Sequence, residues 1–334
     1  MSSSANNATA GGGVPGVPAS VVDRLAAGFA RLPASYAFPA EPPPEEDAFA
    51  YCERLAKSHY ENFSVATWFL PRKLHKHFYS VYAYCRISDD LGDEVGDLQL
   101  SLALLDRWRQ ELALTYESLQ GSSVEPLHPV FVALRRTIRE FGIPQHEFAD
   151  LLTAFRQDQI THRYETFDDL LGYCRNSANP VGHLVLYLGG YSDAERQKLS
   201  DYTCTALQLA NFWQDVAVDY AKDRIYLPLE DFRRFSVCAQ DIPARRFTSE
   251  FRELMRFEVQ RAREWFERGL PLSKMVRGEL ALDIELFSRG GQAILDAIER
   301  QDYDVLSSRP TVSKLRKAGL ALRALSGKLL GARP

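Results

Sequence analysis

The sequence predicts an all-α protein whose body is one domain, residues 46–334. First, apolar residues recur at i, i+3, i+4 and i+7 in long stretches from Asp47 onward, as in Phe78, Val81, Tyr82 and Cys85. Second, strand-like alternation with turn dipeptides is nearly absent. Third, Gly and Pro stand between the periodic stretches, as at Gly142-Ile143-Pro144, and mark the ends of helices.

The chain begins with a segment of different composition. Residues 1–45 are rich in Ala, Gly, Ser and Pro, and we expect them to form a disordered tail, because they hold too little apolar surface to offset the entropy of ordering. Later, residues 181–187 and 205–213 are apolar nearly all round. Helices of that kind belong in the interior of a large protein.

Composition excludes several functional classes. A net charge of −4 and a pI near 6.0 give no general attraction for nucleic acid. The five cysteines are scattered without C-x-x-C spacing, which indicates reduced thiols in a cytoplasmic protein and argues against zinc. No apolar run reaches the roughly 18 to 20 residues of a membrane span. The basic amphipathic run 314–333 would be a packed or frayed terminal helix, or a peripheral contact with a membrane surface.

An acidic stretch, YAYCRISDDLGDEV, covers residues 82–95. On a helix, four of its side chains form a single polar stripe: Tyr82, Arg86, Asp89 and Asp93. A stripe of this kind is either a solvated acidic face or part of a metal site.

A second stretch, residues 208–219, has matched spacing. It places Gln208, Asn211, Asp215 and Asp219 on one stripe, and the other faces of that helix are apolar. Neighbouring carboxylates repel each other unless a cation lies between them, and burying them unpaired costs much more. Ligands that are all oxygen favour a hard ion such as Mg²⁺, which is often shared with substrate phosphates. Together the two stripes predict a substrate that carries a diphosphate.

Four ordered motifs resemble the squalene/phytoene synthase family over about residues 50–320. They are C-R-x-x-D-D-x-x-D at 85–93, Y-C at 173–174, Q-x-x-N-x-x-x-D-x-x-x-D at 208–219 and R-x-Y-L-P at 224–228. The resemblance implies an isoprenoid-synthase fold, a helical bundle around a central cavity. In this fold two aspartate-rich helices face each other and hold Mg²⁺ on the diphosphate.

Residues 59–77 and 173–186 resemble the bacterial hydroxysqualene synthase branch. Residues 178–182 read A-N-P-V-G, where relatives usually carry A-G-x-V-G. The branch implies presqualene diphosphate as substrate, hydroxysqualene and pyrophosphate as products, and functional coupling to a presqualene diphosphate synthase of hopanoid-type biosynthesis. Water ends the reaction in this branch, so NADPH is not expected.

The resemblance also implies roles for single residues. The metal ligands would be Asp89, Asp93, Asn211, Asp215 and Asp219, and the four aspartates, with Tyr173 and Tyr226, would also be catalytic. The residues that would bind substrate are Arg86, Arg224, Gln208, Asn179, Val181, Phe212, Lys76 and Arg72. Arg72, Lys73 or Lys76 would take over a phosphate contact that relatives make with an arginine at the position of His75, or all three would simply face solvent. Core packing is the favoured role for Phe212, but not for Tyr226.

Two questions stay open at this level. Asn179 would either hold the attacking water or, with Pro180, break a helix and cap its backbone. As an alternative to the hydroxysqualene branch, the protein would be a squalene, dehydrosqualene or phytoene synthase. The same aspartates would then serve as metal ligands. A non-enzymatic relative is a further alternative, which the two intact D-x-x-x-D pairs disfavour.

Overall fold

The computed structural model describes residues 19–58 and 71–313. Within these ranges every named element is a helix, and one isolated bridge joins Arg163 to Ile225. The elements are α1 (Ala19–Phe29), η1 (Ala34–Tyr36), α2 (Glu45–Ser58), α4 (Arg72–Asp93), α5 (Leu98–Leu119), α6 (Pro129–Phe141), α7 (Gln145–Gln157), α8 (Phe167–Ser177), α9 (Asn179–Leu188), α10 (Ala194–Ala221), α11 (Leu229–Arg234), η2 (Ala239–Asp241), α12 (Ser249–Gly269), α13 (Leu272–Met275) and α14 (Glu279–Arg300). The predicted all-α fold is confirmed.

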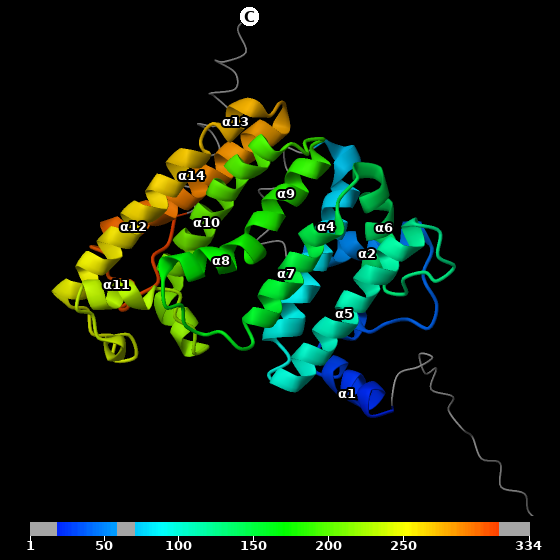
Figure 1. Ribbon diagram of the computed structural model, residues 1–334, viewed down its shortest axis with the longest axis horizontal. Helices are drawn as coiled ribbons and strands as arrows, with labels where there is room; N and C mark the ends of the chain where they lie inside the picture. Colours follow the sequence, from blue (N-terminus) through cyan, green and yellow to red (C-terminus); the bar gives the residue numbers. More distant parts are fainter. Residues whose placement is uncertain (1–18, 59–70, 314–334) are drawn as a thin grey trace, which may run out of the picture.

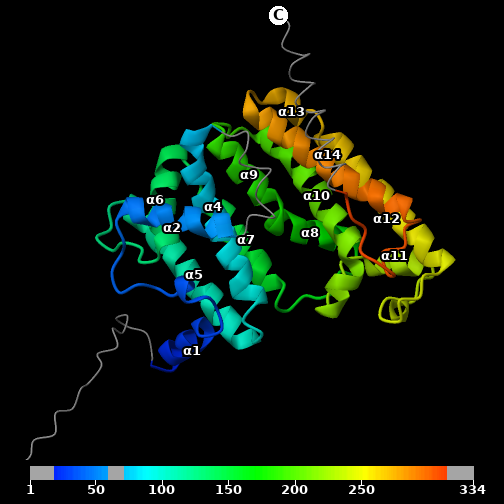
Figure 2. The same ribbon diagram turned by 180° about the vertical axis from the view of Figure 1, so that it is seen from behind.

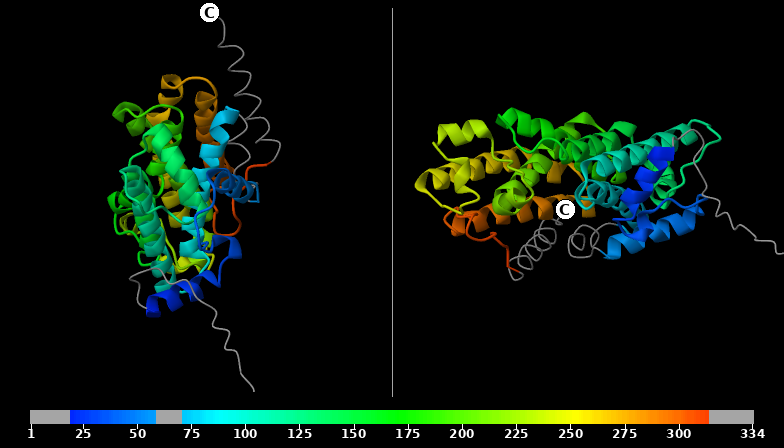
Figure 3. Two further views of the ribbon diagram at one scale, coloured as in Figure 1. Left: turned by 90° about the vertical axis from the view of Figure 1, so that its right-hand side faces the viewer. Right: turned by 90° about the horizontal axis from the view of Figure 1, so that it is seen from below.

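The helices form an elongated bundle with two halves (Figures 1 and 2). In one half α4 packs against α2, α5 and α6, and in the other α10 packs against α12 and α14. Helices α7, α8 and α9 lie between the halves, and the view from below shows the same succession along the long axis (Figure 3). The two halves therefore meet along α7–α9.

Each half has its own hydrophobic cluster. The first includes Trp108 of α5 and Phe131 of α6, whose rings lie 4.5 Å apart. The second includes Trp213 of α10 and Phe266 of α12. Helix α7 contributes Leu151 to the first cluster and Ala154 to the second. Side chains that lie between α4 and α10 therefore have a hydrophobic cluster on either side.

Helix ends follow local sequence signals. The Thr166 hydroxyl accepts from the backbone N–H of Asp169, whose carboxylate accepts from the backbone of Thr166, a capping box that starts α8. Asp193 accepts from the N–H of Arg196 and starts α10. Gly142 ends α6 with φ +63°, a backbone conformation that glycine adopts without strain. These caps fix where the functional helices begin.

The structure corrects the predicted disordered tail over residues 19–45. Helix α1 packs against α5, and Leu32 and Tyr36 are buried in the first cluster. Leu25, Phe29, Leu32 and Tyr36 recur at intervals of three and four residues, so the segment carries one apolar face that its average composition hides. Residues 1–18 lie outside the described residues.

Two other parts of the sequence analysis also fall outside the described residues. They are the basic run 314–333 and most of the branch-like segment 59–77. Among the helices that the structure does describe, none is long and apolar enough to cross a membrane.

Candidate active site

Helices α4 and α10 border one cavity of about 300 Å³. Helices α7 and α8 and the segment after α10 complete its wall. The lining residues are Asp89, Phe155, Asp158, Tyr173, Ser177, Gln208, Asn211, Phe212, Asp215, Asp219, Arg224 and Tyr226. The cavity therefore unites residues of both acidic stripes with aromatic side chains.

The apolar faces of the two helices set the direction of the polar stripes. Ile87 and Leu91 of α4 are fully buried, and the Tyr84 hydroxyl donates to the carbonyl of Phe148 in α7 at 2.8 Å. On α10, the Trp213 indole donates to the carbonyl of Glu258 in α12 at 3.1 Å. Because these contacts fix the rotation of each helix, residues on the opposite face are held toward the cavity.

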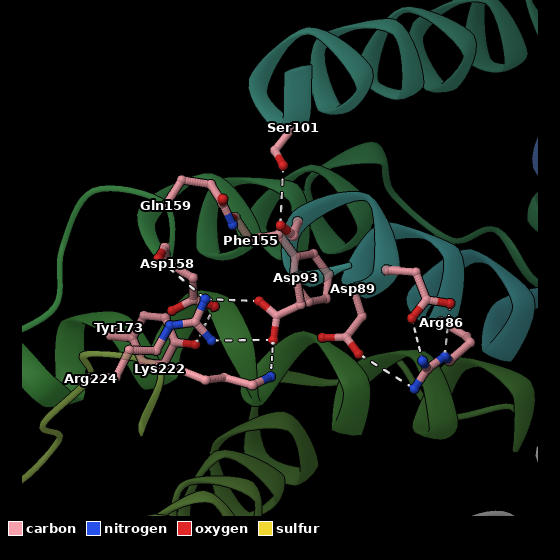
Figure 4. Close-up of polar contacts among 12 residues, drawn as sticks. Arg86, Asp89, Asp93, Ser101, Phe155, Asp158, Gln159, Tyr173, Lys222 and Arg224 are labelled. Atoms are coloured by element: carbon pink, nitrogen blue, oxygen red, sulfur yellow. Dashed lines mark hydrogen bonds and ion pairs between the residues drawn. The ribbon is translucent and has the colours of Figure 1, made fainter. Parts of the chain in front are cut away.

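The first stripe pairs with cations from the segment after α10. Asp93 accepts from the Arg224 guanidinium at 2.8 Å and from the Lys222 ammonium at 2.9 Å (Figure 4). Burial alone would raise the pKa of Asp93, but these two hydrogen bonds outweigh it and lower that pKa. Asp89 lies 3.6 Å from Arg86, and burial together with repulsion by Asp93 raises the pKa of Asp89 to about 6.

The second stripe also has one aspartate that pairs with a basic side chain and one with a raised pKa. Asp215 accepts from the Arg309 guanidinium through both carboxylate oxygens, the longer contact being 3.0 Å. Burial and the neighbouring charge of Asp215 raise the pKa of Asp219 to about 7. Each stripe thus carries one carboxylate that is hydrogen-bonded to a basic side chain, Asp93 or Asp215, and one with a raised pKa, Asp89 or Asp219.

These carboxylates fit a metal that is shared with a ligand. Within residues 19–58 and 71–313, no group of three or more His, Cys, Asp or Glu side chains is close enough to hold an ion by itself. Burial first, and repulsion by the neighbouring carboxylate second, raise the pKa values of Asp89 and Asp219, and a bound cation would favour the ionised form of both. The donor atoms are all oxygen, as Mg²⁺ prefers, and Mg²⁺ commonly completes its shell with water and phosphate oxygens.

An aromatic wall closes one side of the cavity. The rings of Phe212 and Tyr226 stack with centroids 3.8 Å apart, and Tyr173 lies 5.8 Å from Tyr226. Tyr164 packs against Tyr173 at 5.6 Å. Phe212, expected to be a core residue, is buried and also lines the cavity. Aromatic faces of this kind attract cations that have lost their water.

Some of the other residues predicted to bind the diphosphate line the cavity, and some do not. Gln208, Asn211 and Arg224 line the cavity. Arg86 donates instead to both carboxylate oxygens of Asp90, a buried residue next to Asp89. The structure therefore gives Arg86 a carboxylate partner on its own helix.

Arg72 and Lys76 lie near the start of α4 and are exposed. Arg72 precedes Arg86 by four helical turns, about 20 Å along the axis. The Lys76 ammonium lies 5.0 Å from the ring centroid of Phe49. The structure therefore does not bring these two side chains to the cavity.

Asn179 and Val181 are also not among the residues that line this cavity. A helix break falls at Ala178, between α8 and α9, as one of the two readings of Asn179-Pro180 expected. Asn179 is nevertheless not the cap: Ala178 occupies that position, and the Asn179 side chain accepts from the Thr205 hydroxyl at 3.1 Å. Val181 is 40% exposed.

Sequence reasoning missed several residues of the site. Arg309 lies within residues 50–320, over which the chain resembles the family, but outside the four motifs. Lys222 lies between two motifs, and Asp158 stands outside any D-x-x-x-D pair. Nothing in local spacing marks these two, because only the fold brings them to the cavity.

The fold and the site define a class of protein: an all-α bundle in which two aspartate-bearing helices border one cavity. Residues 56–316 match the family model of squalene/phytoene synthase, and the chain belongs to that family. This confirms the family resemblance of the sequence.

Named relatives span several branches of the family. A phytoene synthase of Arthrospira platensis is 30% identical over 293 residues, covering 83% of this chain and 92% of its own. The crystal structure of squalene synthase HpnC from Alicyclobacillus acidocaldarius is 43% identical, with a TM-score of 0.73, and covers 84% of this chain and 98% of its own. The crystal structure of a dehydrosqualene synthase in complex with ligand has a TM-score of 0.74. Its sequence is 26% identical to this chain, and the match covers 85% of this chain and 98% of its own.

Proposed function

We propose that this protein ionises presqualene diphosphate and captures the resulting cation with water, giving hydroxysqualene and pyrophosphate. The observation that carries the proposal is one cavity lined both by Asp89, Asp215 and Asp219 and by the aromatic residues Tyr173, Phe212 and Tyr226. The aspartates would hold cations against a diphosphate, and the aromatic rings would stabilise a carbocation. Presqualene diphosphate carries the diphosphate and, once it is ionised, leaves the carbocation.

The protein's own residues divide the work. Asp89, Asp93, Asn211, Asp215 and Asp219 would hold Mg²⁺, which when bound supplies Lewis-acid stabilisation of the leaving diphosphate. Arg224 lies in the wall, where its guanidinium pairs with Asp93, and it would turn to phosphate oxygens with a forked geometry that a lysine cannot copy. Tyr173, Phe212 and Tyr226 would keep bulk water from the cation until it has rearranged, and would stabilise it by about 2 kcal/mol per well-placed ring.

The choice of reaction within the family has separate support. The squalene synthase HpnC is 43% identical to this chain, whereas the phytoene synthase of Arthrospira platensis is 30% identical. The branch-like segments 59–77 and 173–186 point the same way. A presqualene diphosphate synthase would then supply the substrate, and no NADPH would be consumed.

The test is a product analysis with the full chain. Presqualene, farnesyl and geranylgeranyl diphosphate are each incubated with the protein, with and without Mg²⁺ and NADPH. We expect hydroxysqualene from presqualene diphosphate, dependent on Mg²⁺ and unchanged by NADPH. Squalene formed only with NADPH, or no turnover of presqualene diphosphate, would contradict the proposal.

Two variants connect the reaction to the acidic stripes. Asp219→Asn removes a carboxylate that lines the cavity and should lower turnover by at least about 100-fold, the usual cost of losing a preorganised electrostatic group. Asp241→Asn is the control, because Asp241 is a buried carboxylate that pairs with Arg246 outside the cavity. Its turnover should stay within about twofold of wild type.

A second candidate is the condensation of two prenyl diphosphates, as in a phytoene synthase. The named phytoene synthases favour it, and the same aspartates would serve. Phytoene from geranylgeranyl diphosphate alone in the assay above would establish this alternative.

A further inference from the structure

Asp158, the residue that follows α7, has an unusual environment at the cavity wall. Its side chain is only 8% exposed, and Oδ2 accepts a hydrogen bond from the Tyr173 hydroxyl at 2.8 Å. Its other oxygen, Oδ1, is buried and has no hydrogen-bond partner in the described part of the chain. Both Asp158 and Tyr173 line the cavity (Figure 4).

This pairing costs folding free energy. A buried carboxylate normally satisfies both oxygens, and an unpaired buried acceptor loses its hydration without compensation. An apolar residue of similar size would avoid this cost. A purely structural role therefore does not account for a carboxylate at this position. A role toward the molecule that occupies the cavity does.

The hydrogen bond determines what the Tyr173 hydroxyl can do. A phenol has one proton, and here that proton is directed to Asp158. The lone pairs of the oxygen are thus left to accept from, or point at, whatever occupies the cavity. The ring itself is held by Tyr164 at 5.6 Å and Phe212 at 6.1 Å, so the Asp158 contact fixes the remaining freedom, the rotation of the O–H.

We infer that Asp158 is a positioning residue that turns the Tyr173 hydroxyl oxygen toward the reacting part of the substrate. The inference rests on the proposed function in that the substrate's hydrocarbon chain lies against the aromatic wall. Asp158 acts through Tyr173, and its removal should therefore have no further effect once the hydroxyl is absent.

A double-mutant cycle tests this dependence. The variants are Tyr173→Phe, Asp158→Leu and the pair together, assayed with presqualene diphosphate and Mg²⁺. Each single variant should lower kcat by roughly tenfold, as expected for a lost hydrogen bond to a charged group, with KM changed less than about threefold. The double variant should be no slower than Tyr173→Phe. Asp158→Asn should recover part of the loss, because its amide oxygen still accepts from the phenol.

Independent effects that multiply to about 100-fold in the double variant would overturn the inference, and so would an unchanged kcat in Asp158→Leu. If Asp158→Leu does not fold, the cycle is closed with Asp158→Asn, which must then have no effect in the Tyr173→Phe background. Tyr116→Phe is the matched control. It removes a part-buried hydroxyl contact of 3.0 Å, to the carbonyl of Ile143 and away from the cavity, and should lower thermal stability without changing kcat.

The same cycle separates this inference from the proposed function. If wild type converts farnesyl or geranylgeranyl diphosphate but not presqualene diphosphate, the proposed reaction fails, and the coupling between Asp158 and Tyr173 is measured on the substrate that is used. Inactivity of wild type on all three substrates would overturn both.

Discussion

The Arg309 guanidinium pairs with the Asp215 carboxylate, a contact between the segment after α14 and the second acidic stripe. The neighbouring residues strengthen this connection, because the Gln214 side chain donates to the carbonyl of Pro310 at 2.6 Å. One carboxylate of the predicted metal site is therefore held by a cation of the protein itself.

Arg309→Gln should raise the affinity for Mg²⁺ in the absence of substrate. The ion would no longer have to displace a guanidinium from Asp215, and a half-exposed pair of this kind is worth at most about 1 kcal/mol, or about fivefold in affinity. Calorimetric titration with Mg²⁺ measures the change. Arg252→Gln is the control, since Arg252 pairs with Asp302 at 2.8 Å away from the cavity. Equal or weaker Mg²⁺ binding by Arg309→Gln would show that the two cations do not compete.

Tyr36→Phe should lower the free energy of unfolding by about 1 to 2 kcal/mol. Tyr36 is 1% exposed, and its hydroxyl donates to Asp90 at 2.6 Å, so the change leaves a buried carboxylate that also holds Arg86 with one partner fewer. Urea denaturation measures the loss. Tyr51→Phe removes a bond of 2.8 Å to the carbonyl of Ser35 that is exposed to solvent, although the ring is half-buried, and should cost less than about 0.5 kcal/mol. Equal losses in the two variants would rule out a special role for the Asp90 contact.

Sequence periodicity was sufficient to predict the helices and the direction of both acidic stripes. Spacing on one helix, such as Asp215 and Asp219, depends only on the 3.6-residue turn. The partners of those residues could not be read in the same way. Arg309, Lys222 and Asp158 reach the cavity through tertiary packing, and no local pattern encodes the distance from Arg309 to Asp215. Residues 19–45 were predicted wrongly for a related reason, because average composition hides four well-spaced apolar side chains.

Gly290 and Gly291 of α14 should respond in opposite ways to alanine. A Cβ atom at Gly291 would lie 2.4 Å from Phe266 of α12 and 2.8 Å from Leu207 of α10, so Gly291→Ala should cost about 1 to 3 kcal/mol. A Cβ atom at Gly290 meets nothing within 4 Å in the described structure, and Gly290→Ala should stabilise the helix by about 0.5 to 1 kcal/mol. Thermal and urea denaturation compare the two. Similar effects at both positions would mean that the three helices do not approach closely at Gly291.

His183 joins three helices through two carboxylates. Its Nδ1 lies 2.9 Å from Glu147 of α7 and its Nε2 lies 2.7 Å from Asp201 of α10, with His146 on the far side of Glu147 at 3.4 Å. Burial lowers the pKa of His183, but the hydrogen bonds to Asp201 and Glu147 outweigh burial and raise that pKa to about 9. The protonated imidazole is therefore the form that holds α7, α9 and α10 together.

The raised pKa of His183 predicts how stability depends on pH. The unfolded chain has a histidine pKa near 6.5, so the contribution is complete below about pH 6.5 and is lost as the pH rises through about 9. The difference in unfolding free energy between wild type and His183→Gln should shrink by about 2 kcal/mol between pH 6 and pH 9.5, a value reduced because Asp201 is partly exposed. Other groups titrate in both proteins and cancel in this difference. A difference for His183→Gln that does not change with pH would mean that His183 is neutral in the folded protein.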